Sequence, residues 1–234
     1  MILTLFSASG APGVTTTALA MASFWPRPVT VLETTLGSAV LAGFLRGQLA
    51  HDRGVLGLAA GHRDGTLTEA ITTNSLPVPG TACRVIPGFT NTSQSDAFSP
   101  GAWRAVAEAF QDAGEDLIVD AGRVTSRTFP EALVTAADAR WLMLEGSLPS
   151  IAAAHRLSVP EETALLSVGS QRAYSSKTVA RQLSLPRAGH VPWEPQHARV
   201  FSHGATPVRR LLTSEFSAAM THLVTKAQES GCRV

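Results

Sequence analysis

The stretch Ser7-Ala-Ser-Gly-Ala-Pro-Gly-Val-Thr-Thr-Thr17 decides the fold of this 234-residue chain. The apolar run Ile2–Phe6 precedes it directly and is typical of a buried β-strand. The segment Thr16–Phe24 (TTALAMASF) follows it and is typical of a buried helix. The sequence therefore predicts a strand, a glycine-bearing turn and a helix that begins with threonines, in this order.

This order of elements is the context of a phosphate-binding loop, in which a helix amino end and successive N–H groups surround a phosphate. The consensus G-x-x-x-x-G-K-[ST] corresponds here to Ala8-x-x-x-x-Gly13-Val14-Thr15. The candidate phosphate-loop residues are Gly10, Ala11, Pro12, Gly13, Val14, Thr15 and Thr16. The shape of the loop is retained, and valine replaces its lysine.

The missing lysine removes the positive charge of the loop. The chain has two lysines, Lys177 and Lys226, and both lie in its last third. Loss of one partner of a desolvated charge pair costs about 3–5 kcal/mol, which corresponds to roughly 10²–10³ in affinity. Pro12 also lacks an N–H group to donate. We therefore expect low affinity for a triphosphate unless an arginine or a partner subunit supplies the charge.

Length and composition favour one globular domain over residues 1–234, because 44% of the residues are hydrophobic and 16% are charged. A formal net charge of +1 argues against a surface that coats DNA. Cys83 and Cys232 follow no pattern, so these cysteines indicate neither a disulfide framework nor a metal site, and we expect a cytoplasmic location. The N-terminal segment has no basic residue before Arg27, so we expect no signal peptide.

Strand-like runs alternate with helical segments along most of the chain. The expected strands after the first are Val29–Glu33, Cys83–Pro87, Leu117–Asp120, Arg140–Leu144, Ala164–Val168 and Ala188–Val191. The expected helices after the first are Ser38–Ala50, Trp103–Ala113, Leu148–Leu157 and Ser175–Leu183, and Pro87–Ser99 is expected to be a mobile surface loop. Helical crossovers between strands predict a parallel arrangement. The predicted fold class is therefore α/β, with a doubly wound, mainly parallel sheet and helices on both faces.

Polar residues lie at the ends of three expected strands, where doubly wound sheets bind their ligands. The loop with Thr15 follows the first strand, Glu33 ends the second, and Asp120 ends a later one. A strand-terminal aspartate beside a loop threonine is the Mg²⁺ arrangement of P-loop NTPases. We predict Thr15 and Asp120 as Mg²⁺ ligands for bound ATP or ADP, and Glu33 as the acid of the second strand. In the alternative interpretation, the threonines cap the helix and Asp120 bonds to their hydroxyls.

Together these motifs resemble the ParA/MinD-like P-loop ATPases, which position plasmids, division sites, pili and secretion machines. The family loop K-G-G-x-G-K-[ST]-T is similar to Ser9-Gly-Ala-Pro-Gly-Val-Thr-Thr16, and D-x-D-P-x-G is similar to Glu33-Thr-Thr-Leu-Gly37. The family's D-x-[PG] strand end is matched by Asp120-Ala-Gly122. Its P-x-D-P segment beside the adenine looks like Pro192-Trp-Glu-Pro195, so the resemblance places Pro192 and Glu194 on the adenine side. The resemblance extends over nearly the whole chain, in order.

The departures from the family pattern concern hydrolysis. Ser9 and Val14 replace the two family lysines, and Thr35 stands where the family's catalytic carboxylate orients the attacking water. The family's adenine-reading asparagine falls near Gly169–Ser170, where Gln171 is the nearby amide. The features that shape the turn and hold magnesium are retained. The resemblance thus implies a degenerate member, a pseudo-ATPase.

Two hypotheses follow for the function. The first is a scaffold or positioning factor in cell division, partition, or pilus or secretion assembly, acting through protein partners and a homodimer. The second is a slow Mg²⁺-dependent ATPase with ATP-driven dimerisation, to which Arg123 or Arg127, or an arginine of a partner, supplies the missing charge. A third class, DNA binding through Arg209 and Arg210, is less favoured because of the low net charge. We favour the first hypothesis.

The C-terminal segment has hydrophobic residues at three- and four-residue spacing, which predicts an amphipathic helix. These residues are Val208, Leu211, Leu212, Phe216, Met220, Leu223 and Val224. The opposite face carries few cations, whereas a membrane-surface helix is rich in lysine and arginine there. We expect this helix to dock against the core of the domain and expect no membrane contact.

Overall fold

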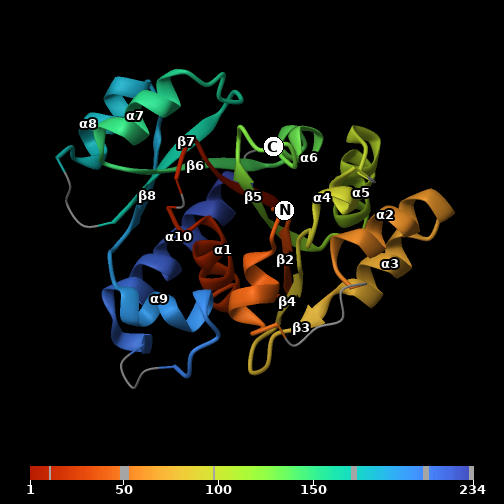
Figure 1. Cartoon of the computed structure of the whole chain (residues 1–234). Helices are drawn as coiled ribbons and strands as arrows, with labels where there is room; N and C mark the ends of the chain where they lie inside the picture. Colours follow the sequence, from red (N-terminus) through yellow and green to blue (C-terminus); the bar gives the residue numbers. More distant parts are fainter. Residues whose placement is uncertain (11, 48–52, 97, 170–172, 208–210, 232–234) are drawn as a thin grey trace.

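A computed structural model describes residues 1–10, 12–47, 53–96, 98–169, 173–207 and 211–231. An eight-stranded sheet with the order β3-β4-β2-β5-β1-β6-β7-β8 forms its centre (Figure 1). The strands are β1 (Ile2–Ser7), β2 (Val29–Glu33), β3 (Leu76–Pro77), β4 (Cys83–Ile86), β5 (Asp116–Arg123), β6 (Ala139–Glu145), β7 (Thr163–Val168) and β8 (Arg187–Val191). All neighbouring strands are parallel except β3 and β4. The predicted fold class is confirmed.

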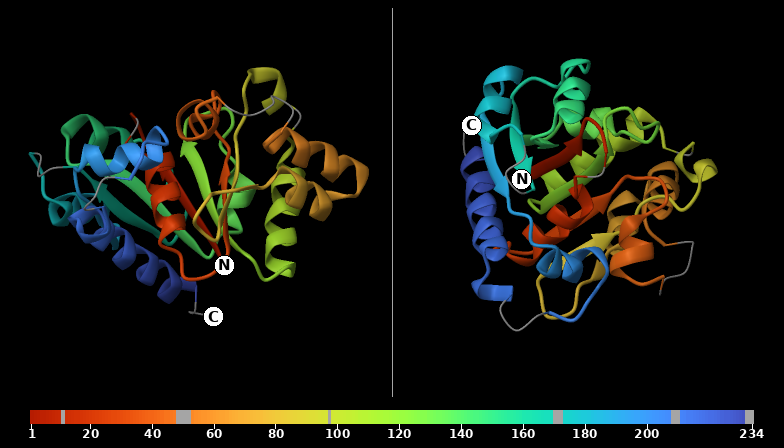
Figure 2. Two further views of the ribbon diagram at one scale, coloured as in Figure 1. Left: turned by 90° about the horizontal axis from the view of Figure 1, so that it is seen from below. Right: turned by 60° about the vertical axis from the view of Figure 1, so that its left-hand side comes forward.

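Helices cover both faces of the sheet (Figure 2). On one face pack α1 (Val14–Ser23), the single π-helical turn η1 (Val40–Phe44), α9 (Pro195–Ser202), the 3₁₀ turn η2 (Leu211–Thr213) and α10 (Glu215–Gly231). On the other face pack α2 (Val55–Asp64), α3 (Leu67–Asn74), α5 (Pro100–Asp112), α6 (Glu131–Thr135), α7 (Leu148–His155) and α8 (Ser176–Leu183). The short α4 (Thr92–Ser95) precedes α5.

Strand β1 lies between the two hydrophobic cores because its side chains alternate. Leu3 and Leu5 pack with α1, whereas Ile2 and Phe6 pack on the opposite face, and all four are fully buried. A strand that is buried on both faces reads as an apolar run without polar alternation. This explains why β1 gives only a poor alternating pattern in the sequence.

The C-terminal helix docks against the core, as predicted. Phe216, Met220, Leu223 and Val224 of α10 are buried against the face that carries α1. Burial of one such side chain contributes about 1.5–3 kcal/mol. Val208, which was also assigned to this amphipathic pattern, lies outside the described residues. None of the helices in the described ranges is long and apolar enough to span a bilayer.

Two of the predicted segments differ in the structure. The helix predicted over Ser38–Ala50 is wrong, because the described part of this range, residues 38–47, forms only the short turn η1. Arg46 and Gly47 follow the turn with positive φ angles of 51° and 68°, which end a helix. The segment Pro87–Ser99 contains α4 and the buried Phe89, so it is not simply a surface loop. The paired helices α2 and α3 were not predicted.

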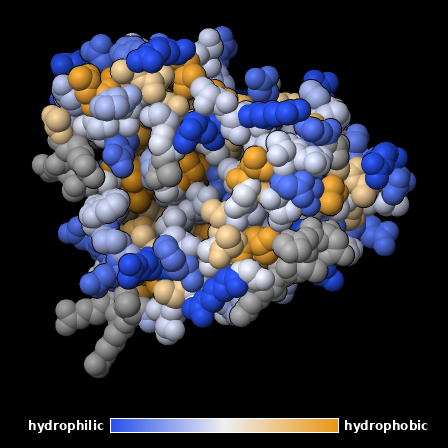
Figure 3. Space-filling view, viewed as in Figure 1, coloured by the Kyte–Doolittle hydropathy of each residue, from blue (hydrophilic) through white to orange (hydrophobic). Residues whose placement is uncertain are grey.

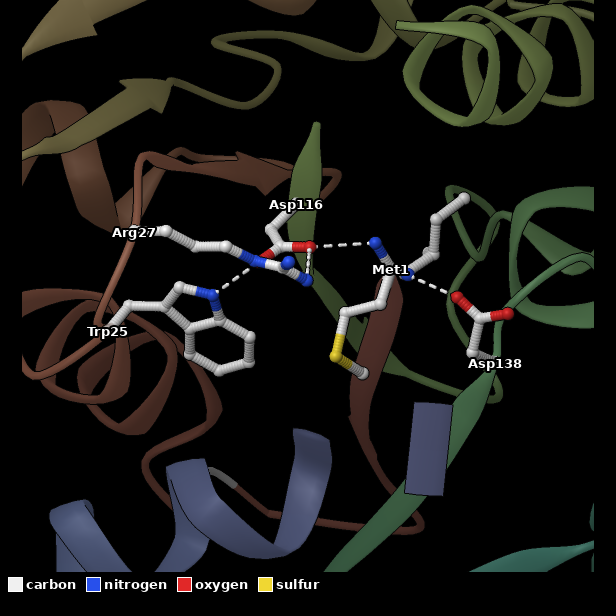
Figure 4. A network of polar contacts seen from close by, with 6 residues as sticks. Met1, Trp25, Arg27, Asp116 and Asp138 are labelled. Atoms are coloured by element: carbon white, nitrogen blue, oxygen red, sulfur yellow. Dashed lines mark hydrogen bonds and ion pairs between the residues drawn. The ribbon is translucent and has the colours of Figure 1, made fainter. Parts of the chain in front are cut away.

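A buried carboxylate organises the edge of the sheet where the strands begin (Figure 4). Asp116 opens β5 and accepts hydrogen bonds from the amino nitrogen of Met1 at 2.7 Å, from Trp25 Nε1 at 2.7 Å and from Arg27 Nη2 at 2.8 Å. Beside it, Asp138 accepts from the backbone N–H of Ile2 at 2.6 Å. Burial alone raises the pKa of Asp116, but these hydrogen bonds and the Met1 charge hold this pKa below its usual value.

We expect Asp116→Asn to lower the free energy of unfolding by about 1–3 kcal/mol at pH 7, because it weakens the hydrogen bonds of buried donors. The pKa of Asp116 is lowered by folding, so its stabilisation is present above about pH 4, the pKa of an unfolded aspartate. The difference between the variant and the wild type should therefore shrink as the pH falls below 4. Urea unfolding from pH 7 to 3 measures this. The exposed Asp112→Asn in α5 is the control, and a pH-independent difference would contradict the prediction.

Candidate functional site

The phosphate-loop sequence forms a tight turn between β1 and α1. Gly10 and Gly13 have φ angles of 67° and 87°, a left-handed conformation that favours glycine. Helix α1 begins at Val14, two residues earlier than predicted, and Gly13 caps it without any side-chain hydrogen bond. The first N–H groups of a helix have no partner within the helix and point away from its amino end. The turn therefore has the donors that a phosphate requires.

An open cavity of about 580 Å³ lies at this turn. The predicted loop residues Gly10, Pro12, Gly13, Val14, Thr15 and Thr16 all line it, together with the predicted metal ligand Asp120. Ala11 lies outside the described residues. Residues that the sequence analysis did not assign also line it, among them Ala39, Thr125 and Ser126. Their involvement depends on which loops the sheet brings together, and no local motif in the sequence signals it.

Thr15 and Asp120 are in direct contact, since the Thr15 hydroxyl donates a hydrogen bond to Asp120 Oδ2. Asp120 is fully buried and also accepts from the N–H of Gly122 at 3.1 Å. Burial and, to a smaller extent, the neighbouring charge of Glu33 raise the pKa of Asp120 to about 7, although the hydrogen bonds from Thr15 and Gly122 act in the opposite direction. A cation at this point would lower the cost of ionising Asp120.

The Thr15–Asp120 pair fits a magnesium ion in its chemistry. A hydroxyl and a carboxylate are the hard oxygen ligands that Mg²⁺ prefers, and the ion usually completes its shell with water and phosphate oxygens. Among the residues that the structure describes, no group of three or more His, Cys, Asp or Glu side chains forms a metal site. This pair alone would bind Mg²⁺ loosely, so the ion would depend on a bound phosphate for further ligands.

Glu33 anchors a loop. It is fully buried and lies beside Asp120 in the register of β2 and β5. Its carboxylate accepts from the hydroxyl of Thr35 at 2.8 Å and from the N–H groups of Ala39 at 2.7 Å and Gly88 at 2.9 Å. The hydroxyl of a further residue, Ser38, also donates to it. This second-strand acid thus holds Thr35 and Ala39 at the rim of the cavity.

Thr35 lines the cavity at the place where the resemblance puts a catalytic carboxylate. Its methyl group lies close to the backbone of Gly122. A Cβ atom added at Gly122 would lie 2.6 Å from Thr35 Cγ2. Gly122 has a φ of 66°, so both its conformation and its surroundings require glycine. Threonine carries no group that is a base at neutral pH.

The two arginines that follow Asp120 lie in different places. Arg123 lines the cavity, and its Nη2 donates to the carbonyl oxygen of Gly10 at 3.0 Å. Arg127 forms an exposed ion pair with Asp96 at 2.7 Å and lines a neighbouring cavity. Of these two arginines, Arg123 is therefore the candidate for the charge that the loop lacks.

The predicted adenine-side residues lie elsewhere at the same sheet edge. Pro192 and Glu194 follow β8, and Glu194 forms an ion pair with His197. Glu194 lines a separate cavity with His197 and Ser214, and neither Pro192 nor Glu194 is among the described residues around the loop cavity. Ser170 and Gln171 lie outside the described ranges. A role beside adenine stays a prediction.

Comparison with solved structures shows that other proteins share this fold. A ParA family ATPase from Chlorobium tepidum is 12% identical, with a TM-score of 0.73 and coverage of 96% of this chain and 97% of the other. The chain has the ParA/MinD fold. MinD in the MinC:MinD complex of Aquifex aeolicus is 15% identical, with a TM-score of 0.75 and coverage of 97% and 96%. MinD of Pyrococcus horikoshii, complexed with Mg-ADP, is 11% identical, with a TM-score of 0.72 and coverage of 98% and 97%. No protein-family model and no curated protein matches the sequence.

We expect Glu33→Gln to lower the free energy of unfolding by about 1–3 kcal/mol. In the wild type, several buried donors bind both carboxylate oxygens of Glu33, whereas in the variant the NH₂ group of the amide would face some of these donors. Chemical denaturation at pH 7 measures this. The matched control is Glu108→Gln on the exposed face of α5, which should change stability by less than about 0.5 kcal/mol. Equal effects of the two substitutions would contradict the anchoring role.

Proposed function

We propose that this chain is a ParA/MinD-fold protein with a degenerate nucleotide site, and that it acts as a scaffold or positioning factor through protein contacts. The observation that carries the proposal is the charge of the loop. Val14 is 6% exposed at the first position of α1, where the family loop has its lysine. Lys177 lies in α8, and Lys226 pairs with Glu229 in α10 at 3.6 Å. Neither lysine lines the loop cavity.

The chemistry around the loop supports the same conclusion about turnover. Hydrolysis requires a group that orients and activates water, and positive charge that stabilises the transferred phosphoryl group. The residue at the rim is Thr35, whose hydroxyl already donates to Glu33. A nucleotide bound here would act as a static ligand, because Thr35 offers no base at the rim and Val14 offers no ammonium group in the loop.

Exposed hydrophobic residues support a role through protein contacts. Among the described residues, the large hydrophobic side chains with high exposure include Leu148 at 63%, Trp193 at 59%, Leu36 at 47% and Tyr174 at 38%. They follow β6, β8, β2 and β7, so all four belong to the sheet edge that carries the phosphate loop. On the face seen in Figure 3, hydrophobic residues form separate patches, one of them at the upper left over α7 and α8.

The partners proposed for this edge are a second copy of the chain and other proteins. One of the similar structures is a complex of MinD with MinC, which supports partner binding by this fold. The processes that we propose are cell division, partition, or pilus or secretion assembly, in the cytoplasm. DNA binding is not part of the proposal, and Arg209 and Arg210 lie outside the described residues.

The alternative function is a slow ATPase with ATP-driven dimerisation. The contact between Thr15 and Asp120 favours it, because these residues would hold Mg²⁺ when a nucleotide is bound. Mg²⁺ would supply charge at the phosphate oxygens, and Arg123 is near enough to the loop to add to it. The two functions differ in whether ATP changes the oligomeric state.

We expect self-association to be the same with and without Mg-ATP, as measured by sedimentation velocity. The double variant Leu148→Ser/Trp193→Ser should weaken it about tenfold or more, because it removes large apolar contacts. The matched control is Leu212→Ser, since Leu212 is 80% exposed but belongs to η2, does not follow a strand directly, and lines a different cavity with Phe24 and Gly80. An ATP-dependent cycle between monomer and dimer would contradict the proposed function and support the ATPase.

We expect titration calorimetry to show that Val14→Lys binds Mg-ATP roughly 10²–10³ times more tightly than the wild type, because the substitution restores the missing charge. Val14→Met has a similar chain length without charge and is the control. Asp120→Ala in the wild-type background tests the metal site, and should abolish turnover if the chain is a slow ATPase. An unchanged affinity of Val14→Lys would show that the loop charge does not limit binding.

A further inference from the structure

The end of β5 departs from regular pairing beside the phosphate loop. Leu5 of β1 is in register with Asp120, but Ser7 is in register with Arg123, so β5 has one more residue than β1 over this interval. Such a bulge bends the strand and redirects its side chains. The positive φ of Gly122, at 66°, lies within the irregular stretch.

The bulge places Arg123 on the loop. The N–H of the next residue, Val124, donates to the carbonyl oxygen of Ser7 at 3.0 Å, which holds this stretch against the end of β1. The Arg123 guanidinium reaches across to the carbonyl oxygen of Gly10 at 3.0 Å through Nη2. A guanidinium has five N–H donors in a planar fork. The bond to Gly10 uses one of them, so others are available to a ligand in the cavity.

Among the described residues that line this cavity, Arg123 carries the positive charge, and Asp120 is the other residue with an ionisable side chain. An anion bound at the amino end of α1 would therefore lie between helix N–H groups and this guanidinium. Arginine binds phosphate oxygens in a bidentate manner, and these charge-assisted bonds are stronger than the bond to a neutral carbonyl. The Gly10 contact is one that a phosphate group can replace.

We propose that Arg123 binds the phosphate chain of a nucleoside di- or triphosphate and takes the place of the lysine that the loop lacks. This inference rests on the proposed nucleotide site. It specifies the class of ligand that binds there and the residue that supplies the positive charge. The charge comes from the strand that also provides Asp120, with two residues between them, so one short segment of β5 supplies both the metal carboxylate and the phosphate-binding cation.

The test is calorimetric titration of the full chain with Mg-ADP and with magnesium pyrophosphate at low salt. Arg123→Ala should weaken the binding of both about 10- to 100-fold, the usual effect of removing a hydrogen bond to a charged group, and Arg123→Lys should recover part of the loss. The matched control is Arg127→Ala, which removes a nearby exposed arginine that pairs with Asp96, and it should bind as the wild type does. Thermal unfolding of each variant checks that the fold is intact.

Binding of adenosine separates phosphate recognition from a general structural role. Adenosine has no phosphate, so its affinity should be the same for the wild type and Arg123→Ala. Equal losses for adenosine and ADP, or wild-type ADP affinity in Arg123→Ala, would overturn the inference. So would a wild type that binds neither ADP nor pyrophosphate, although the proposed scaffold role would then still stand on the self-association measurement. Conversely, an ATP-driven dimer cycle would refute the scaffold role and leave the Arg123 result unaffected.

Discussion

The carboxyl edge of the sheet depends on two buried carboxylates, Glu33 and Asp120, which lie next to each other at the ends of β2 and β5. Neither is exposed to solvent. A buried carboxylate is costly unless hydrogen bonds satisfy it, and here the donors come from loops. Glu33 holds the segment that follows β2 and the turn at Gly88, and Asp120 holds Thr15 in the phosphate loop. The position of each loop is therefore fixed by the carboxylate beneath it.

This arrangement explains how the loop keeps its shape without its lysine. The turn is set by Gly10 and Gly13, and its attachment to β5 is set by the Thr15–Asp120 hydrogen bond. None of these features involves the side chain at position 14. The absence of a lysine at position 14 affects the electrostatics instead, because two adjacent carboxylates lie below a loop without a charged side chain. The raised pKa of Asp120 reflects its burial and the charge of Glu33, and a bound cation would relieve both effects.

The sequence predicted those parts of the site that depend on local patterns. Strand, glycine turn and helix follow one another within residues 2–23, and Asp120 ends an apolar strand, so Thr15 and Asp120 could be paired from the parallel topology alone. The anchoring role of Glu33 could not, because Ala39 and Gly88 approach it from separate segments. Arg123 was only one of two candidate arginines, since a one-residue bulge decides which of them reaches the loop. The helix predicted over Ser38–Ala50 is wrong because the spacing of hydrophobic residues gives no information on backbone conformation. In the structure the backbone becomes left-handed at Arg46 and Gly47, which ends the helical turn.

The magnitude of the apolar contacts limits how the proposed scaffold could associate. Complete burial of Leu148 and Trp193 on both copies of a symmetric pair would contribute on the order of 6–12 kcal/mol, and less in practice because neither side chain is fully exposed beforehand. Association itself costs about 4–15 kcal/mol. These side chains alone therefore give a weak, reversible contact, which needs polar contacts or a partner protein to become stable. A positioning factor must release its partner as well as bind it, and an edge with dispersed apolar residues around the proposed anion site meets that requirement better than a continuous hydrophobic interface would.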